Sequence, residues 1–109
     1  MKDFNTPVSL HVFNRPRETA LLLNILKKIK PKYLFITCDG PKEGHDYLVN
    51  ETKKTIENEI DWNCEIYKNY SESNKGSYLN NSHGLSWVFD HVDEAIILED
   101  DCIPTESFF

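Results

Sequence analysis

Hydrophobic residues follow a two-residue period at the start of the chain and then change to a helical period. Residues 7–13 carry apolar side chains at every second position, which predicts a strand. Pro16 and Glu18 suit the first turn of a helix, and Pro31 ends that helix. Its apolar stripe has the spacing i, i+3, i+4, i+7, at Leu22, Ile25, Leu26 and Ile29.

The middle of the chain repeats this change of period. Residues 33–38 are apolar almost throughout and predict a buried strand, and residues 39–44 have the composition of a loop. Asp46 is the expected cap of a second helix. Residues 63–67 predict a short third strand with weaker alternation. One side of the second helix carries Leu48 or Val49, Thr52, Ile56 and Ile60.

The last part of the chain predicts a third helix and a fourth strand after a polar loop at about residues 68–76. Residues 95–98 form an apolar run that is typical of a buried strand. After Pro104, residues 105–109 resemble the opening of another helix. The third helix starts near Tyr78, and its apolar stripe consists of Leu85, Val88, Phe89 and Val92.

Strands and helices thus alternate along the whole chain, which predicts an α/β fold with a mostly parallel, Rossmann-like sheet. Right-handed crossovers place the helices on both faces of such a sheet. The length of 109 residues suits one domain, residues 1–109. Because no complete helix follows to cover the fourth strand, we expect the first half of a larger domain, truncated after that strand.

Charge and composition exclude several classes of function. The formal net charge of -6 argues against a protein that binds nucleic acid. No apolar run has the length of a transmembrane segment, and the N-terminus lacks the apolar core of a signal peptide. A cytoplasmic location is expected, and peripheral association with the inner face of a membrane stays open. Cys38, Cys64 and Cys102 are expected to be reduced and structural.

Three consecutive carboxylates, Glu99, Asp100 and Asp101, come directly after the fourth strand. Such a cluster repels itself and is costly to desolvate, so it suits a site that holds a cation. Hard oxygen ligands at the end of a strand favour Mg²⁺ or Mn²⁺, especially an ion that is shared with a phosphate. The alternative is a solvated acidic turn that ends the strand.

Other polar residues are expected at the same edge of the sheet. In open parallel sheets, ligands bind beyond the carboxyl ends of the strands. Asn14 and Arg15 follow the first strand, Asp39 follows the second, and residues 74–76 lie on the loop after the third. Together with the carboxylates, these residues predict a site for a nucleoside diphosphate that is bridged to the protein by a divalent cation.

Chemistry assigns a role to each of these groups. Asp101, the farthest from the strand, is the expected metal ligand. Asp100 suits the ribose hydroxyls, Asp39 suits the ribose or the base edge, and Arg15 suits a phosphate or the base. An Asx turn at Asp39 and a helix start at Arg15 are the structural alternatives. No histidine has a partner at metal spacing, so none is assigned to chemistry, and His83 is the nearest to this edge.

Five segments of the chain carry a family resemblance in the right order, at residues 7–16, 39–41, 87–89, 96–104 and 108–109. They resemble the N-terminal, donor-binding half of GT-A glycosyltransferases, above all bacterial sugar transferases of the family 2 type. Those enzymes are similar to the eukaryotic N-acetylglucosaminyltransferase I group, which carries a Glu-Asp-Asp version of the Asp-x-Asp motif. Glu99-Asp100-Asp101 matches that version.

The resemblance implies transfer of a sugar from a UDP-linked or other nucleotide-sugar donor to a glycan or another hydroxyl acceptor, with Mn²⁺ or Mg²⁺ and usually with inversion. The catalytic base and most of the acceptor site of the family come from a C-terminal half that is not in this chain. The matched positions are Asp101 for the metal, Asp100 for the ribose, Glu99 for the donor sugar, and Arg15 and Asp39 for the uridine side of the nucleotide. Asn14, beside Arg15, is also expected to bind the nucleotide.

Two other classes of function are alternatives to a glycosyltransferase. A sugar nucleotidyltransferase would have a glycine-rich loop after the first strand, where this chain has Asn14-Arg15-Pro16-Arg17. A non-enzymatic acidic metal-binding module, such as a phosphoacceptor receiver domain, would have an acidic pair after the first strand, and here the acids follow the fourth. The uncovered fourth strand also predicts self-association through the edge of the sheet.

Overall fold

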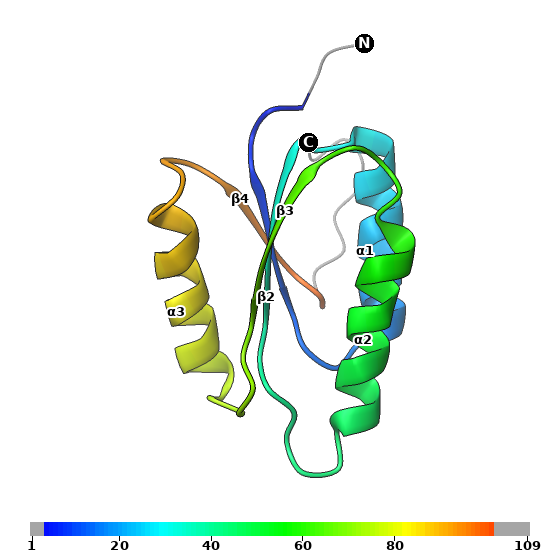
Figure 1. Cartoon of the computed structure of the whole chain (residues 1–109), viewed down its shortest axis with the longest axis vertical. Helices are drawn as coiled ribbons and strands as arrows, with labels where there is room; N and C mark the ends of the chain where they lie inside the picture. The colour runs from blue at the N-terminus through cyan, green and yellow to red at the C-terminus, as the bar shows by residue number, and fades with distance from the viewer. Residues whose placement is uncertain (1–3, 102–109) are drawn as a thin grey trace.

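Strands and helices alternate throughout residues 4–101, the part of the chain that a computed structural model describes (Figure 1). Cys102 and the helix expected after Pro104 lie outside the described residues. The expected α/β alternation is confirmed. The elements are β1 (Val8–Val12), α1 (Pro16–Ile29), β2 (Tyr33–Cys38), α2 (Asp46–Glu59), β3 (Glu65–Tyr70), α3 (Ser77–Phe89) and β4 (Ile96–Glu99).

The four strands form one parallel sheet in the order β3-β2-β1-β4. α1 and α2 cover one face and α3 covers the other (Figure 1), which confirms a Rossmann-like sheet with helices on both faces. The strand order reverses at β1, because β2 pairs with one side of it and β4 pairs with the other. At such a switch point, the connections diverge and leave a crevice beyond the carboxyl ends of the strands.

The two faces of β1 meet different surroundings. Val8 and Leu10 have no exposed surface and belong to the core with residues of α1 and α2. Ser9 and His11 alternate with them and therefore face α3. The sheet thus has an apolar side and a side with buried polar groups.

Helix α3 approaches the polar side of the sheet very closely at Gly84. A Cβ atom at this position would lie 2.7 Å from Cγ2 of Thr37 and 3.1 Å from Cε1 of His11. Glycine is therefore required here by the lack of space. The buried residues of α3 are Asn80, Gly84 and Val88, and Phe89 is 48% exposed. The expected stripe was correct at Val88 and wrong at Phe89, because close contact with the sheet favours the small residues Asn80 and Gly84 over more apolar ones.

Three further details differ from the expectations. β3 extends to Tyr70, through residues expected to form a loop, because its backbone pairs with all six residues of β2. An edge strand gains these hydrogen bonds even where its side chains are polar. Asp46 is the first residue of α2 and not its cap, since the helix starts after His45 without a side-chain cap. In α1, Leu23 is buried, whereas Ile25 and Ile29 of the expected apolar stripe are only partly buried.

No helix among residues 4–101 is both long enough and apolar enough to cross a membrane.

Cys38 is buried in the core, and burial raises the pKa of its thiol to about 11. Its Sγ lies 3.5 Å from the carbonyl oxygen of Asp39 and 3.9 Å from that of Phe13. A thiol in this environment remains protonated and packs as a small apolar group.

Two neighbouring leucines of α1 provide a test of the core. Leu22 has no exposed surface and Leu21 is 48% exposed. Leu22→Ala is expected to lower the free energy of unfolding by about 2–5 kcal/mol, because it leaves a cavity between the helix and the sheet. Leu21→Ala should change it by less than about 0.5 kcal/mol. Denaturant unfolding measures both, and equal losses would contradict the packing of this face.

Candidate functional site

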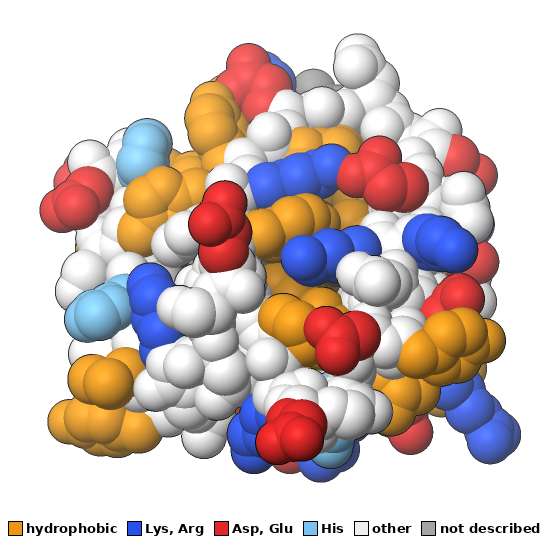
Figure 2. All heavy atoms as spheres, turned by 60° about the horizontal axis from the view of Figure 1, so that its bottom comes forward, with side chains coloured by type: hydrophobic (Ala, Val, Ile, Leu, Met, Phe, Trp, Pro, Cys, Tyr) orange, Lys and Arg blue, Asp and Glu red, His pale blue; other side chains and the backbone are white. Residues whose placement is uncertain are grey.

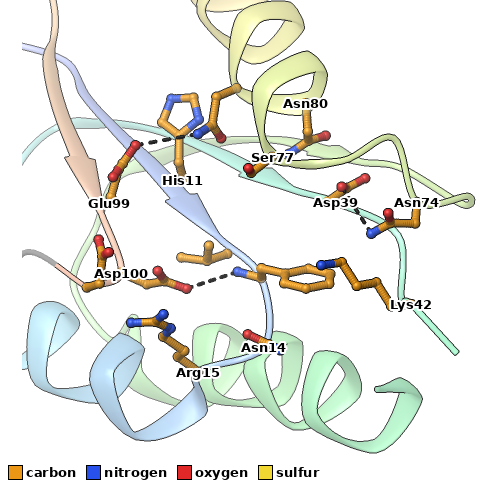
Figure 3. A pocket seen from close by; sticks show the side chains of 14 residues that line it. His11, Asn14, Arg15, Asp39, Lys42, Asn74, Ser77, Asn80, Glu99 and Asp100 are labelled. Carbon is orange, nitrogen blue, oxygen red and sulfur yellow. Dashed lines mark hydrogen bonds between the residues drawn. The ribbon is translucent and has the colours of Figure 1, made fainter. Parts of the chain in front are cut away.

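A pocket with a volume of about 340 Å³ lies where β1, β2 and β4 end and α3 begins (Figure 3). All six residues that the sequence analysis selected line this one pocket: Asn14, Arg15, Asp39, Glu99, Asp100 and Asp101. They are separated by up to 87 positions in the chain. Parallel pairing brings them together, because it places the carboxyl ends of the strands at one edge of the sheet.

Acidic groups outnumber basic groups in the pocket by two, since four carboxylates and the two cations Arg15 and Lys42 line it. On the side of the molecule that includes this edge, acidic and basic side chains lie interspersed around hydrophobic ones (Figure 2). A strongly anionic ligand would meet repulsion from this acidic excess unless a cation accompanied it.

Asp100 is held by the backbone of β1. The N–H of Phe13 donates to Oδ2 of Asp100 at 3.1 Å, and the N–H of Asp100 donates to the carbonyl oxygen of His11 at 3.1 Å. Burial raises the pKa of the Asp100 carboxyl. The hydrogen bond from Phe13 and the charge of Arg15 both lower this pKa, but by less. The guanidinium of Arg15 lies beside Asp100 (Figure 3). One oxygen of Asp100 is thus fixed, and the carboxyl cannot turn away from the pocket.

Glu99 and Asp101 flank this fixed group and are both exposed. Nδ2 of Asn81 donates to Oε1 of Glu99 at 3.4 Å, a long contact that leaves the carboxylate mostly solvated. Within residues 4–101, no three His, Cys, Asp or Glu side chains are grouped so that they could hold a metal ion by themselves. The three carboxylates are hard oxygen donors that fit Mg²⁺ or Mn²⁺ only if a ligand supplies the other oxygens.

Asn14 and Arg15 lie in the turn between β1 and α1. Nδ2 of Asn14 lies 2.8 Å from Nδ1 of His45, so the amide is already paired with the loop before α2. Arg15 is the residue before the first turn of α1, and the carbonyl oxygen of Arg15 accepts from the N–H of Thr19 at 2.9 Å. Its guanidinium makes no hydrogen bond or ion pair with residues 4–101 and is exposed at the pocket.

Asp39 is only 5% exposed, although it lines the pocket. Both of its carboxylate oxygens accept hydrogen bonds from the chain, some from the loop that precedes α3. The expected contact of this carboxylate with a ribose or a base stays a prediction. Lys75, expected at the same edge, donates its backbone N–H to Asp39, and its side chain does not line the pocket.

His11 belongs to the pocket wall and was not predicted there. The side chain is 5% exposed, with Nε2 at 3.3 Å from Oγ of Ser9, and its Nδ1 has no hydrogen-bond partner in the described part of the chain. The sequence did contain a signal for this position. His11 alternates with the apolar residues of β1, which places its side chain on the other face of the sheet, toward α3. His83, which the sequence placed nearest this edge, is exposed and does not line the pocket.

Lys42 and the first turns of α3 supply the other groups that sequence reasoning missed. The ammonium of Lys42 lies 6.0 Å from the ring centre of Phe13, over the aromatic face. Ser77, Asn80 and Asn81 present hydroxyl and amide groups from α3. A polar helix turn has no distinctive sequence pattern, so only the packing of α3 on the sheet identifies these residues.

Burial of His11 predicts a pH-dependent stability. Burial lowers the pKa of the imidazole, and Asn81 and Glu99 offset part of that shift. Below about pH 6.5, His11 is therefore protonated more readily in the unfolded chain than in the folded one. The free energy of unfolding should fall as the pH drops through that value. Denaturant unfolding between pH 8 and pH 5.5 should show that the free energy of unfolding depends less steeply on pH in His11→Gln than in the wild type. The exposed control His83→Gln should keep the wild-type slope, and an unchanged slope in His11→Gln would contradict the interpretation.

Comparison of the chain with protein-family models, with curated proteins and with solved structures gives no match.

Proposed function

We propose that this pocket binds a nucleoside-diphosphate sugar together with Mn²⁺ or Mg²⁺, and that the chain is the donor-binding part of a GT-A-type glycosyltransferase. The single observation that carries the proposal is the convergence of all six predicted site residues on one pocket at the switch point of the sheet. Polar groups at such a point are the usual ligand contacts of open parallel sheets.

The acidic excess of the pocket supports a ligand that arrives with a cation. Asp101 is exposed and stands at the end of the carboxylate cluster, so it is the proposed metal ligand, and the diphosphate would supply other oxygens. When bound, the ion supplies charge neutralisation at the diphosphate leaving group.

The remaining groups divide by how firmly the chain holds them. Asp100 is fixed by the N–H of Phe13 and suits directional hydrogen bonds from ribose hydroxyls. Arg15 has a free, rigid guanidinium next to the carboxylates, which suits a phosphate or the base edge. Glu99 is exposed and suits the donor sugar. The acceptor, a glycan or another hydroxyl compound, and the catalytic base have no residues assigned within this chain.

A titration of UDP into the protein with Mn²⁺ tests the proposal. Binding should require the metal, and Asp101→Asn should weaken it by at least about tenfold, because removal of the carboxylate leaves the ion held mainly by the nucleotide. Asp93→Asn, which neutralises an exposed carboxylate before β4, is the control and should bind like the wild type. Calorimetry provides the affinities.

Other outcomes of this titration separate the alternatives. Binding of GDP but not of UDP would support a nucleotide-sugar site whose donor carries guanine and not uracil. Mn²⁺ binding that is insensitive to any nucleotide would favour the non-enzymatic metal-binding module. Absence of binding by both nucleotides to folded protein would overturn the proposal.

The edge of the sheet at β4 supports the expected self-association. β4 pairs only with β1 among the described strands, and Ile97 is 37% exposed. Unpaired backbone groups on such an edge can pair with a second copy. Sedimentation should show association that rises with concentration and that is lost in Ile97→Lys. Ile66→Lys on the opposite edge is the control, and a monomer at all concentrations would contradict this prediction.

A further inference from the structure

The carboxylate of Asp39 ties the end of β2 to the loop before α3. Oδ1 accepts from the N–H of Gly40 at 2.8 Å and from the N–H of Lys75 at 2.9 Å. Oδ2 accepts from the N–H of Gly76 at 3.0 Å and from Nδ2 of Asn74 at 3.2 Å. Three of the four donors come from residues 35 to 37 positions away in the chain, so these bonds hold a distant loop against the end of β2.

These bonds use the whole hydrogen-bonding capacity of the carboxylate. A carboxylate has about four lone-pair sites, and the chain already provides four donors for Asp39. The residue is also 5% exposed. A base or a ribose could bond to this carboxylate only by displacing one of these four donors, three of which are backbone N–H groups that would then be left without a partner.

The backbone around Asp39 is adapted to this arrangement. A Cβ atom on Gly40 would lie between 2.4 and 2.8 Å from backbone atoms of Ser73, so only glycine lets the loop come this close to the end of β2. Gly76 has a φ of 85°, a conformation that residues with a side chain rarely adopt. Together with Asn74, these glycines allow both backbone N–H groups, of Lys75 and Gly76, to reach one carboxylate.

The loop that Asp39 holds is one wall of the pocket. Asn74 and Ser77 line the pocket from this loop and from the first turn of α3 (Figure 3). The amide of Asn74 also donates to the carbonyl oxygen of Gly40 at 2.8 Å, which adds a second link between the loop and β2. The position of this wall relative to the carboxylates of β4 therefore depends on Asp39.

We propose that Asp39 is a positioning residue, which sets the place of the wall formed by residues 74–77 and does not itself bond to the ligand. The proposal rests on the proposed function, in which the pocket binds a nucleoside diphosphate. It differs from the direct contact with ribose or base that the sequence suggested. A direct contact with the base would act on one kind of nucleotide, and a direct contact with the ribose would not depend on Asn74. A displaced wall instead weakens binding of every nucleotide that fills the pocket and is disturbed from either side of the link.

Substitutions on both sides of the link separate these two possibilities. Asp39→Asn replaces one acceptor oxygen by an NH₂ group that faces two donors, and Asn74→Ala removes the partner from the loop. With Mn²⁺ present, each should weaken UDP binding, Asp39→Asn by about tenfold, because groups that hold a binding wall typically have effects of this size. The double variant should be weakened by less than the product of the single effects, because both act on the same loop. Weakening of GDP or CDP binding, where measurable, should match that of UDP binding.

A second variant and a second measurement exclude a general loss of stability. Thr52→Ala removes a buried hydroxyl that donates to the carbonyl oxygen of Leu48 in α2, so it lowers stability away from the pocket. It should leave nucleotide affinity unchanged at a temperature where all variants are folded. Amide hydrogen exchange without ligand should be faster at residues 75–77 in Asp39→Asn than in Thr52→Ala.

The outcomes are distinct. Wild-type affinity in Asn74→Ala, combined with weaker nucleotide binding in Asp39→Asn, would overturn the positioning role in favour of direct contact. The contact is with the base if only uridine nucleotides are affected, and with the ribose if all nucleotides are affected alike. Unchanged exchange at residues 75–77 in Asp39→Asn would overturn it without reference to any ligand. If the wild type binds no nucleotide, the proposed function fails, and the exchange measurement alone decides whether Asp39 positions the wall.

Discussion

The structure depends on the parallel pairing of β1 with a neighbour on each side. All five residues of β1 are buried, and β2 and β4 bond to its two edges in a register that pairs Leu10 with both Ile36 and Leu98. This register places the ends of three strands at the same level. The turn after β1, the turn after β2 and the acidic end of β4 therefore share one edge, and the pocket is a direct result of strand order.

The two helical layers contribute differently to the molecule. α1 and α2 bury leucine, isoleucine and valine side chains and supply most of the apolar burial that stabilises the fold. α3 contributes a buried asparagine, a glycine and a valine and lies on His11 and Thr37. A layer with so many polar groups stabilises less, but it brings hydrogen-bonding side chains to the pocket. Most of the stabilising apolar burial thus lies on the α1 and α2 side of the sheet, whereas both sides contribute polar groups to the pocket.

The charged groups of the pocket also divide into two sets. The carboxylates of Asp39 and Asp100 are buried in part or in full and accept backbone hydrogen bonds, so they act first as parts of the scaffold. Arg15 and Asp101 are exposed and free to meet a ligand. Fixed groups next to exposed ones suit a ligand that brings a cation. The fixed groups set the geometry, Asp101 offers an oxygen to the cation, and Arg15 offers donors to the anionic part of the ligand.

Sequence patterns alone determined the order of strands and helices, the α/β class and the group of residues at the carboxyl edge, because periods of two and 3.6 residues and turn chemistry act over a few positions. Tertiary structure decided the full length of β3, since pairing with β2 outweighed its polar composition. It also decided that Gly84 is packed against the sheet while Phe89 is 48% exposed, and that three of the four donors to Asp39 come from a loop 35 to 37 positions away. Such contacts depend on which strands become neighbours, and no local pattern contains that information.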